Sequence, residues 1–254
     1  MILSKSQIVS LPAKNRIVFP LDVLSIDEAK HLIKLLKDHI GLFKVGLTLF
    51  VNEGFQVIKI IEDIVGVGGE SKIFFDLKFH DTPETLGNVS TVLMSKSHGL
   101  KFVTVHTSEG EKIVRAVVDK MQSGTKVLGI TVLTSLTEEE SKELGYPGSI
   151  EERVLTRAGI AKRAGCAGVV CSGHEAKAVK QKFGEDFIVV TPGIRPSWSN
   201  IINDDQRRIM TPKEAILNGS DYIVVGRPIS IAKDPVEASD KIAQEIEEAL
   251  SLKS

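Results

Sequence analysis

The 254-residue sequence has few cysteines, few aromatic residues and almost no net charge, and it contains no long apolar run. With 32 basic and 33 acidic residues, the formal net charge is −1, so electrostatics give no reason to expect nucleic acid or a membrane as the main partner. No stretch reaches the roughly 18 uninterrupted apolar residues that a membrane-spanning helix needs. We therefore expect the main ligand to be a small molecule.

The two cysteines, Cys166 and Cys171, lie in or beside apolar segments, which favours reduced core thiols over a disulfide framework. Residues 1–15, which we interpret as an N-terminal extension, contain no long apolar segment and no small-residue cleavage site. These features predict a cytoplasmic protein.

Short runs rich in Val, Ile and Phe recur along the chain and are apolar at odd and even positions alike, which is typical of parallel strands covered on both faces. Eight strands are predicted, at residues 16–23, 43–48, 72–79, 102–107, 126–133, 168–172, 187–194 and 222–229.

Helical patterns separate these strands. One helix is predicted to bury Ala29, Leu32, Ile33 and Leu36, and the last is predicted to run from Pro235 to about Leu252 behind an Asp234 cap. Strand–helix units at intervals of roughly 30 residues, with no break in composition, predict one α/β domain over residues 1–254, a (β/α)₈ TIM barrel.

The segment FFDLKFHD, at residues 74–81, carries charges inside a run that is otherwise apolar enough for a buried strand. Side chains alternate across a strand, so Asp76 and Lys78 should share one face. Two charges on one face of a buried strand indicate either a structural ion pair or an active site with Lys78 as acid, base or Schiff-base amine.

Further charges stand near the carboxyl ends of neighbouring predicted strands. Asp22 ends the first strand, Lys44 lies early in the second, and Asp81 follows the third. Barrel interiors are normally filled with branched apolar side chains, so this convergence favours an active site at that end of the barrel.

The ends of the seventh and eighth strands read TPGIRP and VVGRPI, where barrel enzymes often bind phosphate. Gly226 would let the backbone approach an anion, Arg227 could hold it with a bidentate fork, and Gln206 could close over it from the long connection at 195–211. Loop arginines are usually solvated, so the residues alone assign no role to Arg195, Arg207 or Arg208. Long connections follow both the fifth and the seventh strands, and both are expected at the functional face.

These motifs, in this order over nearly the whole chain, resemble the orotidine 5′-monophosphate decarboxylase family. The matching segments are PLD at 20–22, FKVG at 43–46, FFDLKFHDTPET at 74–85, VTVHTSEG at 103–110, TVLTS at 131–135, TPGIRP at 191–196, DQRRIMTP at 205–212 and VVGRP at 224–228. The resemblance implies a barrel without metal or other cofactor that converts orotidine 5′-monophosphate to uridine 5′-monophosphate in pyrimidine biosynthesis.

The resemblance also implies roles for single residues. Lys78, with Asp76 and Asp81 beside it, would stabilise the carbanion at C6 and protonate it. Lys44 and Asp22 would hold the ribose, Thr134 would meet the pyrimidine, and Arg195 would join the phosphate site of Gln206, Gly226 and Arg227. Asp81 and Thr85 would reach into the partner's site of a homodimer.

Four other interpretations stay open at this point. A sister family decarboxylates 3-keto-gulonate 6-phosphate with magnesium, but it usually lacks a lysine equivalent to Lys44. A Schiff-base aldolase needs a neutral lysine, whereas neighbouring carboxylates favour the charged form. A metal site of His80, Asp76 and His106 has a weak ligand set, and a nucleotide-binding barrel without activity would not need Asp76, Lys78 and Asp81.

Overall fold

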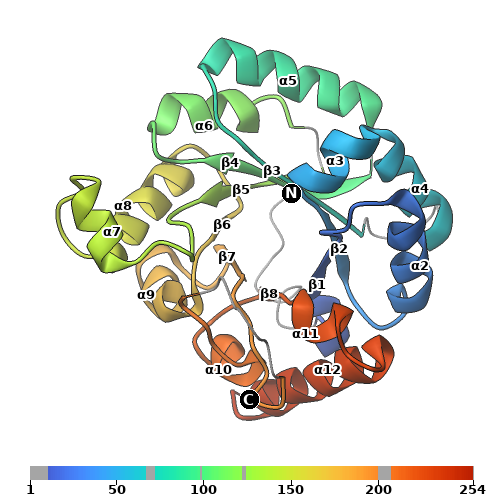
Figure 1. Ribbon diagram of the computed structural model, residues 1–254. Coiled ribbons are helices and arrows are strands. Elements are labelled where there is room, and N and C mark those ends of the chain that lie inside the picture. The colour runs from blue at the N-terminus through green and yellow to red at the C-terminus, as the bar shows by residue number, and fades with distance from the viewer. Residues whose placement is uncertain (1–10, 67–71, 98, 122–123, 200–206, 254) are drawn as a thin grey trace.

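Eight parallel strands close into a barrel, in chain order from β1 to β8, within the part of the chain that the structure describes. This computed structural model describes residues 11–66, 72–97, 99–121, 124–199 and 207–253. The helices form an outer ring around the strands (Figure 1). The predicted α/β class and TIM barrel architecture are confirmed.

The strands are short, and each is paired to its neighbours in parallel. Their bounds are β1 Ile17–Pro20, β2 Leu42–Val45, β3 Ile73–Phe79, β4 Leu100–His106, β5 Lys126–Ile130, β6 Gly168–Val170, β7 Ile188–Thr191 and β8 Tyr222–Val224. All eight predicted strands exist, but most end earlier than their apolar runs do. The apolar residues beyond the strand ends belong to the loops and short helices of the carboxyl-terminal face.

The helices and one 3₁₀ turn have the following bounds: η1 Ala13–Arg16, α2 Ile26–Leu36, α3 Leu47–Glu53, α4 Gln56–Val65, α5 Pro83–Lys96, α6 Glu111–Val118, α7 Glu138–Glu143, α8 Ile150–Arg163, α9 Gly173–Phe183, α10 Pro212–Leu217, α11 Arg227–Ser230 and α12 Pro235–Ser251. Helix α2 buries the predicted stripe. The Asp234 carboxylate accepts hydrogen bonds from the first turn of α12, as expected of an N-cap.

One connection differs from the expectation, and one predicted segment lies partly outside the described residues. The connection after β5 contains the short helix α7, whose start is fixed by a capping box between Thr137 and Glu140. Of the predicted N-terminal extension, residues 1–10 lie outside the described residues, while η1 places Ala13 against the core. The assignment of residues 1–15 as an extension therefore stays a prediction.

Apolar side chains fill the barrel interior and the space between the sheet and the helices. The interior cluster consists of Val18, Leu42, Phe74, Phe102, Leu128, Ala167, Ile188, Val190 and Tyr222. Two larger clusters join the outer faces of the strands to the helices. Because the interior is packed, a ligand can only bind above it, at one end of the barrel.

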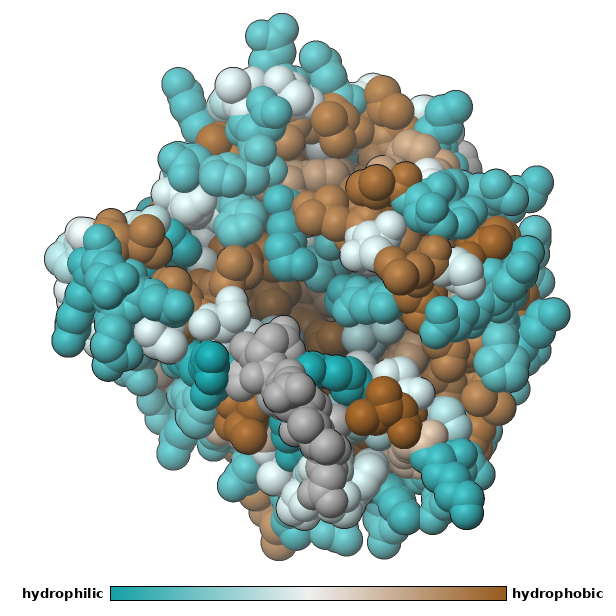
Figure 2. Space-filling view, in the orientation of Figure 1, coloured by the Kyte–Doolittle hydropathy of each residue, from teal (hydrophilic) through white to brown (hydrophobic). Residues whose placement is uncertain are grey.

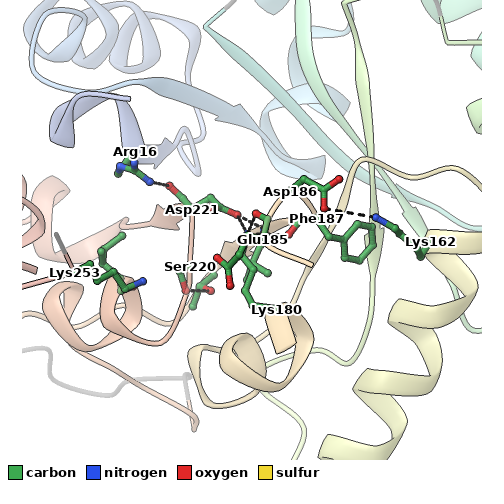
Figure 3. A network of polar contacts seen from close by, with 12 residues as sticks. Arg16, Lys162, Lys180, Glu185, Asp186, Phe187, Ser220, Asp221 and Lys253 are labelled. Atoms are coloured by element: carbon green, nitrogen blue, oxygen red, sulfur yellow. Dashed lines mark hydrogen bonds and ion pairs between the residues drawn. The ribbon is translucent and has the colours of Figure 1, made fainter. Parts of the chain in front are cut away.

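The amino-terminal end of the barrel is held by a buried ion pair. Lys180 Nζ lies 2.7 Å from Asp221 Oδ2 and also donates to the carbonyl of Phe187 at 3.0 Å. The Asp221 carbonyl accepts from Arg16 at 3.3 Å (Figure 3). These contacts join α9, the starts of β7 and β8, and η1, so this end of the barrel serves stability.

No helix among the described residues is both long enough and apolar enough to cross a membrane.

The two cysteines are free and buried, as predicted. Burial raises the pKa of Cys166 and of Cys171 to about 12, so both remain neutral thiols at pH 8. We expect a thiol-specific alkylating reagent at pH 8 to modify neither cysteine in the folded protein and both in guanidinium chloride, measured by intact mass. Rapid modification of either thiol without denaturant would contradict the packing described here.

Candidate active site

A cavity of about 710 Å³ opens at the carboxyl-terminal end of the barrel. Figure 2 shows a hollow at the centre of this face, with hydrophobic side chains at its floor and hydrophilic ones on its rim. The cavity is lined by Phe19, Pro20, Asp22, Val23, Glu28, Lys44, Phe74, Asp76, Lys78, Ile130, Val132, Leu133, Thr134, Ser135, Val170, Pro192, Gly193, Arg195, Val224, Gly226, Arg227, Ser230 and Ile231.

The charged side chains of the cavity follow directly from strand alternation. Leu42 and Phe74 belong to the apolar layer of the barrel interior, and Lys44 and Asp76 come two residues after them. A step of two residues returns a side chain to the same face of a strand, one layer higher. The sequence therefore stacks a charged layer on the apolar layer in adjacent strands.

The charges of this layer alternate in sign along a continuous row. Lys44 Nζ lies 3.4 Å from Asp22 Oδ1 and 3.5 Å from Asp76 Oδ2. Lys78 Nζ lies 2.8 Å from the same oxygen of Asp76. The side-chain exposure is 61% for Asp22, 12% for Lys44, 9% for Asp76 and 35% for Lys78, so the middle of the row is buried and both of its ends are more exposed.

The buried Asp76 carboxylate lies between the two ammonium groups. Burial raises its pKa, but the charges of Lys44 and Lys78, together with hydrogen bonds from Lys78 and Thr104, outweigh that effect and hold the pKa below its ordinary value of 3.8. Asp76 is therefore an anion at neutral pH. The row therefore ends on the Lys78 ammonium, which is partly exposed and lines the cavity.

The backbone of β3 is irregular where it presents Lys78. Phe75 pairs with Val103 and Phe79 with Val105, so β3 uses four residues where β4 uses two, and the register shifts between these pairs. Lys78 has φ 51°, and it is the one non-glycine residue with positive φ in the described chain. Such a conformation costs roughly 1–3 kcal/mol and is concentrated at functional sites.

The irregularity of β3 between Phe75 and Phe79 is a β-bulge, and it adds a second physical reason why Asp76 and Lys78 pair. Simple alternation predicted that the two side chains would share a face, and they do meet. However, the direction of the Lys78 side chain also depends on the left-handed backbone at that residue. Simple alternation along a regular strand does not predict such a conformation.

Thr104 holds the bulge in place, and the sequence argument missed it. Its hydroxyl accepts a hydrogen bond from the backbone N–H of Lys78 at 2.9 Å and donates one to Asp76 Oδ1 at 2.9 Å. Thr104 is fully buried. The sequence did contain a signal for Thr104. Thr104 lies two residues after Phe102 of the barrel interior, just as Asp76 lies two residues after Phe74, which indicates that both belong to the same polar layer.

Asp81 and Thr85 lie outside the cavity of their own chain. Asp81 Oδ1 accepts a hydrogen bond from the Thr82 amide at 2.6 Å, which lowers the pKa of Asp81. Thr85 sits in the first turn of α5, with its hydroxyl 3.0 Å from that of Thr82. Within the described chain, the Lys78 ammonium forms an ion pair with Asp76 and none with Asp81. The bend after Phe79 separates Asp81 from the row of charges.

The opposite side of the cavity is built by the ends of β7 and β8. Arg195 and Arg227 both line it, and both are half-buried. A Cβ atom on Gly226 would lie 2.9 Å from Cγ of Pro20, so only glycine allows this close approach of the β8 end to β1. Thr134 also lines the cavity and is buried. Gln206 lies outside the described residues.

The two histidines of the metal-site alternative lie beside Glu109, at the ends of β3 and β4. The rings of His80 and His106 are 5.2 Å apart, and His80 Nε2 lies 3.3 Å from the Glu109 carboxylate. Burial lowers the pKa of His106. Among the described residues, no group of three or more His, Cys, Asp and Glu side chains has the arrangement of a metal site.

Comparison with known proteins gives matches over nearly the whole chain. Residues 15–242 match the model of the orotidine 5′-phosphate decarboxylase / HUMPS family. The chain is 44% identical to the orotidine 5′-phosphate decarboxylase of Desulfosudis oleivorans, over 96% of this chain and 97% of that protein. It is 41% identical to the enzyme of the same name from Heliobacterium modesticaldum, over 95% and 99% of the two chains.

A solved structure gives the same result. The crystal structure of orotidine 5′-phosphate decarboxylase from Lactobacillus acidophilus superimposes with a TM-score of 0.76 at 36% identity, covering 91% of this chain and 98% of that one.

The low pKa of Asp76 predicts how stability depends on pH. A lowered pKa in the folded state stabilises the protein above the unfolded pKa, and this contribution is lost as pH falls through the folded value. Asp76→Asn leaves two ammonium groups without their shared anion, so we expect it to lower the free energy of unfolding at pH 7 by about 3–5 kcal/mol. The deficit should shrink below about pH 4.

Urea unfolding followed by circular dichroism from pH 7 down to about pH 2 measures this difference, because the contribution is lost below the unfolded pKa. Asp240→Asn is the matched control, because Asp240 pairs with His39 at the exposed surface and should contribute at most about 1 kcal/mol. A deficit for Asp76→Asn that stays constant across this pH range would contradict the lowered pKa.

Proposed function

Since the chain belongs to the orotidine 5′-phosphate decarboxylase / HUMPS family, we propose that it decarboxylates orotidine 5′-monophosphate to uridine 5′-monophosphate, a step of pyrimidine nucleotide synthesis. One observation carries the assignment of roles. The alternating row of Asp22, Lys44, Asp76 and Lys78 lines the same cavity as the arginines at the ends of β7 and β8. The Lys78 ammonium, beside the buried Asp76 carboxylate, therefore lies across the cavity from Arg195 and Arg227, whose guanidinium groups can bind an anion.

The chemistry explains why this row matters. Loss of CO₂ from C6 of the pyrimidine leaves an anion in the ring plane, where the ring's π system cannot delocalise it. Lys78, fixed at 2.8 Å from Asp76, carries the positive charge that would stabilise this anion and the proton that would replace CO₂. After the transfer, C6 bears the proton and Lys78 is left as a neutral amine.

Magnitudes show which effect must dominate. A positioned general acid typically contributes about 10²–10⁴-fold, whereas enzymes lower barriers by roughly 8–23 kcal/mol. Two charges about 4 Å apart attract by about 4 kcal/mol at an effective dielectric constant of 20. We therefore assign Lys78 two roles, electrostatic stabilisation of the carbanion first and proton donation second.

The phosphate of the substrate would bind at the opposite wall. Arg227 begins the short helix α11 after β8, the position where barrel enzymes bind phosphate, and its guanidinium can donate two parallel hydrogen bonds. Gly226 brings this segment close to β1, and Arg195 lines the same wall. We assign Gln206 to the phosphate as well, on the family motif alone. Binding energy from this remote group would align the ring at Lys78.

The remaining cavity residues fit the middle of the substrate. Lys44 and Asp22 lie between the buried Asp76 and solvent, where they would hold the ribose hydroxyls. Thr134, buried on the wall after β5, would meet the pyrimidine. This assignment places the ring deep and the phosphate at the rim.

Asp81 and Thr85 support a shared site between two copies of the chain. Both are exposed, and neither lines the cavity of its own chain. A hydrogen bond from Thr82 fixes the carboxylate of Asp81. We propose a homodimer in which these two residues reach the partner's cavity, next to the partner's lysine. We further propose a cytoplasmic location, which reduced and buried cysteines support.

The direct test of activity is the loss of ultraviolet absorbance when orotidine 5′-monophosphate is mixed with purified protein. We expect turnover by the native chain in the presence of EDTA, because no step assigned above uses a metal. Lys78→Ala should lower kcat by roughly 10⁴-fold or more, since it removes both the charge and the proton donor. Lys213→Ala is the control, because Lys213 pairs with Glu248 at the surface. No turnover by the native chain would contradict the proposal.

The shared site is tested by mixing subunits. Asp81→Ala and Lys78→Ala proteins should each be nearly inactive alone. In a mixed dimer, one site receives an intact lysine from one subunit and an intact aspartate from the other. Random mixing in equal amounts should recover about a quarter of native activity, since half of the dimers are mixed and each has one complete site. Mixtures no more active than either parent would show that Asp81 acts within its own chain.

A further inference from the structure

Arg208, which the sequence left among solvated loop residues, is largely buried and forms an ion pair with Glu175. Its neighbours Arg207 and Ile209 are exposed, so only the middle side chain of the three turns inward. Glu175 lies in the first turn of α9, and 4% of its side chain is exposed. The ion pair thus joins the connection between β7 and α10 to the helix that follows β6.

The two described ends of this connection lie side by side. Ile194 and Met210 form a parallel bridge. The Arg195 amide donates to the carbonyl of Met210 at 2.9 Å, and the Met210 amide donates to the carbonyl of Gly193 at 3.2 Å. The backbone position of Arg195, at the wall of the cavity, is therefore set by Met210.

Met210 is in turn packed against α9. A Cβ atom on Gly173, the first residue of α9, would lie 2.6 Å from Sδ of Met210, so the two residues are in close contact. Asn218 donates hydrogen bonds to the Gly173 carbonyl at 3.2 Å and to Met210 Sδ at 3.5 Å. Residues 208–210 are thus attached to α9 at two points. Arg208 forms its ion pair with Glu175, and Met210 packs against Gly173.

The burial of the pair makes it sensitive to loss of either partner. Oε2 of Glu175 and Nη1 of Arg208 are buried and have no hydrogen-bond partner among the described residues. The ion pair compensates part of the cost of burying both groups, so removing either partner leaves the other charge buried with less compensation. The segment that carries Arg208 would then move toward solvent, and Met210 would move with it.

We propose that Glu175 and Arg208 are positioning residues for the phosphate wall: their ion pair fixes Met210, and Met210 fixes Arg195. This inference rests on the proposed function, because it takes the 5′-phosphate of a nucleotide as the group that Arg195 meets. Neither residue of the pair lines the cavity.

A double-mutant cycle with uridine 5′-monophosphate as the probe tests this route. Glu175→Gln should weaken binding about tenfold in the native background, measured by isothermal titration calorimetry, and less than about twofold in an Arg195→Ala background. Two changes that act through one residue do not add. An equal loss in both backgrounds, or no loss in the native one, would overturn the proposal.

Asp221→Asn is the matched control, because it also removes the carboxylate of a buried ion pair but at the opposite end of the barrel. It should lower stability and leave nucleotide affinity unchanged; a loss of affinity equal to that of Glu175→Gln would overturn the proposal. If Glu175→Gln does not fold, the same cycle is measured with Arg208→Lys. This variant keeps the positive charge but removes the planar guanidinium, and the same criterion applies to its loss of affinity in the two backgrounds. If the native chain binds uridine 5′-monophosphate but does not turn over orotidine 5′-monophosphate, the proposed function is contradicted while the cycle still decides the role of the ion pair.

Discussion

The active site depends on one buried carboxylate. Asp76 is an anion inside the barrel because two ammonium groups and one hydroxyl contact it, and each of those groups comes from a different place in the chain. Lys44 stands on β2, Lys78 on the bulge of β3 and Thr104 on β4. Parallel pairing of β2 with β3 and of β3 with β4 brings these groups together, and without it Asp76 would lose Lys44 and Thr104 as compensation for its burial.

The same barrel separates two kinds of buried charge. At the amino-terminal end, the Lys180–Asp221 pair is buried and makes hydrogen bonds with backbone carbonyl and amide groups (Figure 3). At the carboxyl-terminal end, Lys78 is bound on one side by Asp76 and open to the cavity on the other. A buried ion pair such as Lys180–Asp221 contributes to the stability of the fold. A cation such as Lys78, which is exposed to the cavity on one side, can also stabilise negative charge that develops on a substrate.

The sequence contained enough information for the architecture and for most of the charged row. Strand count, the stripe of α2 and the Asp234 cap depend on local periodicity and local hydrogen bonds, so a linear pattern predicts them. The bulge at Lys78 could not be predicted, because its cause is the Thr104 hydroxyl on another strand. The burial of Arg208 was missed for a similar reason, since Glu175 lies far away in the sequence. Asp81 is a different case, because its proposed partner belongs to another copy of the chain.

The left-handed backbone at Lys78 has a consequence for how this protein can evolve. Glycine adopts that conformation without strain, but Lys78→Gly would also remove one of the two ammonium groups that compensate the buried Asp76 carboxylate. Breaking a buried ion pair costs about 3–5 kcal/mol, more than the roughly 1–3 kcal/mol of backbone strain. Selection for thermal stability and selection for turnover should therefore both keep lysine at position 78, and a library screened only for folding should retain it.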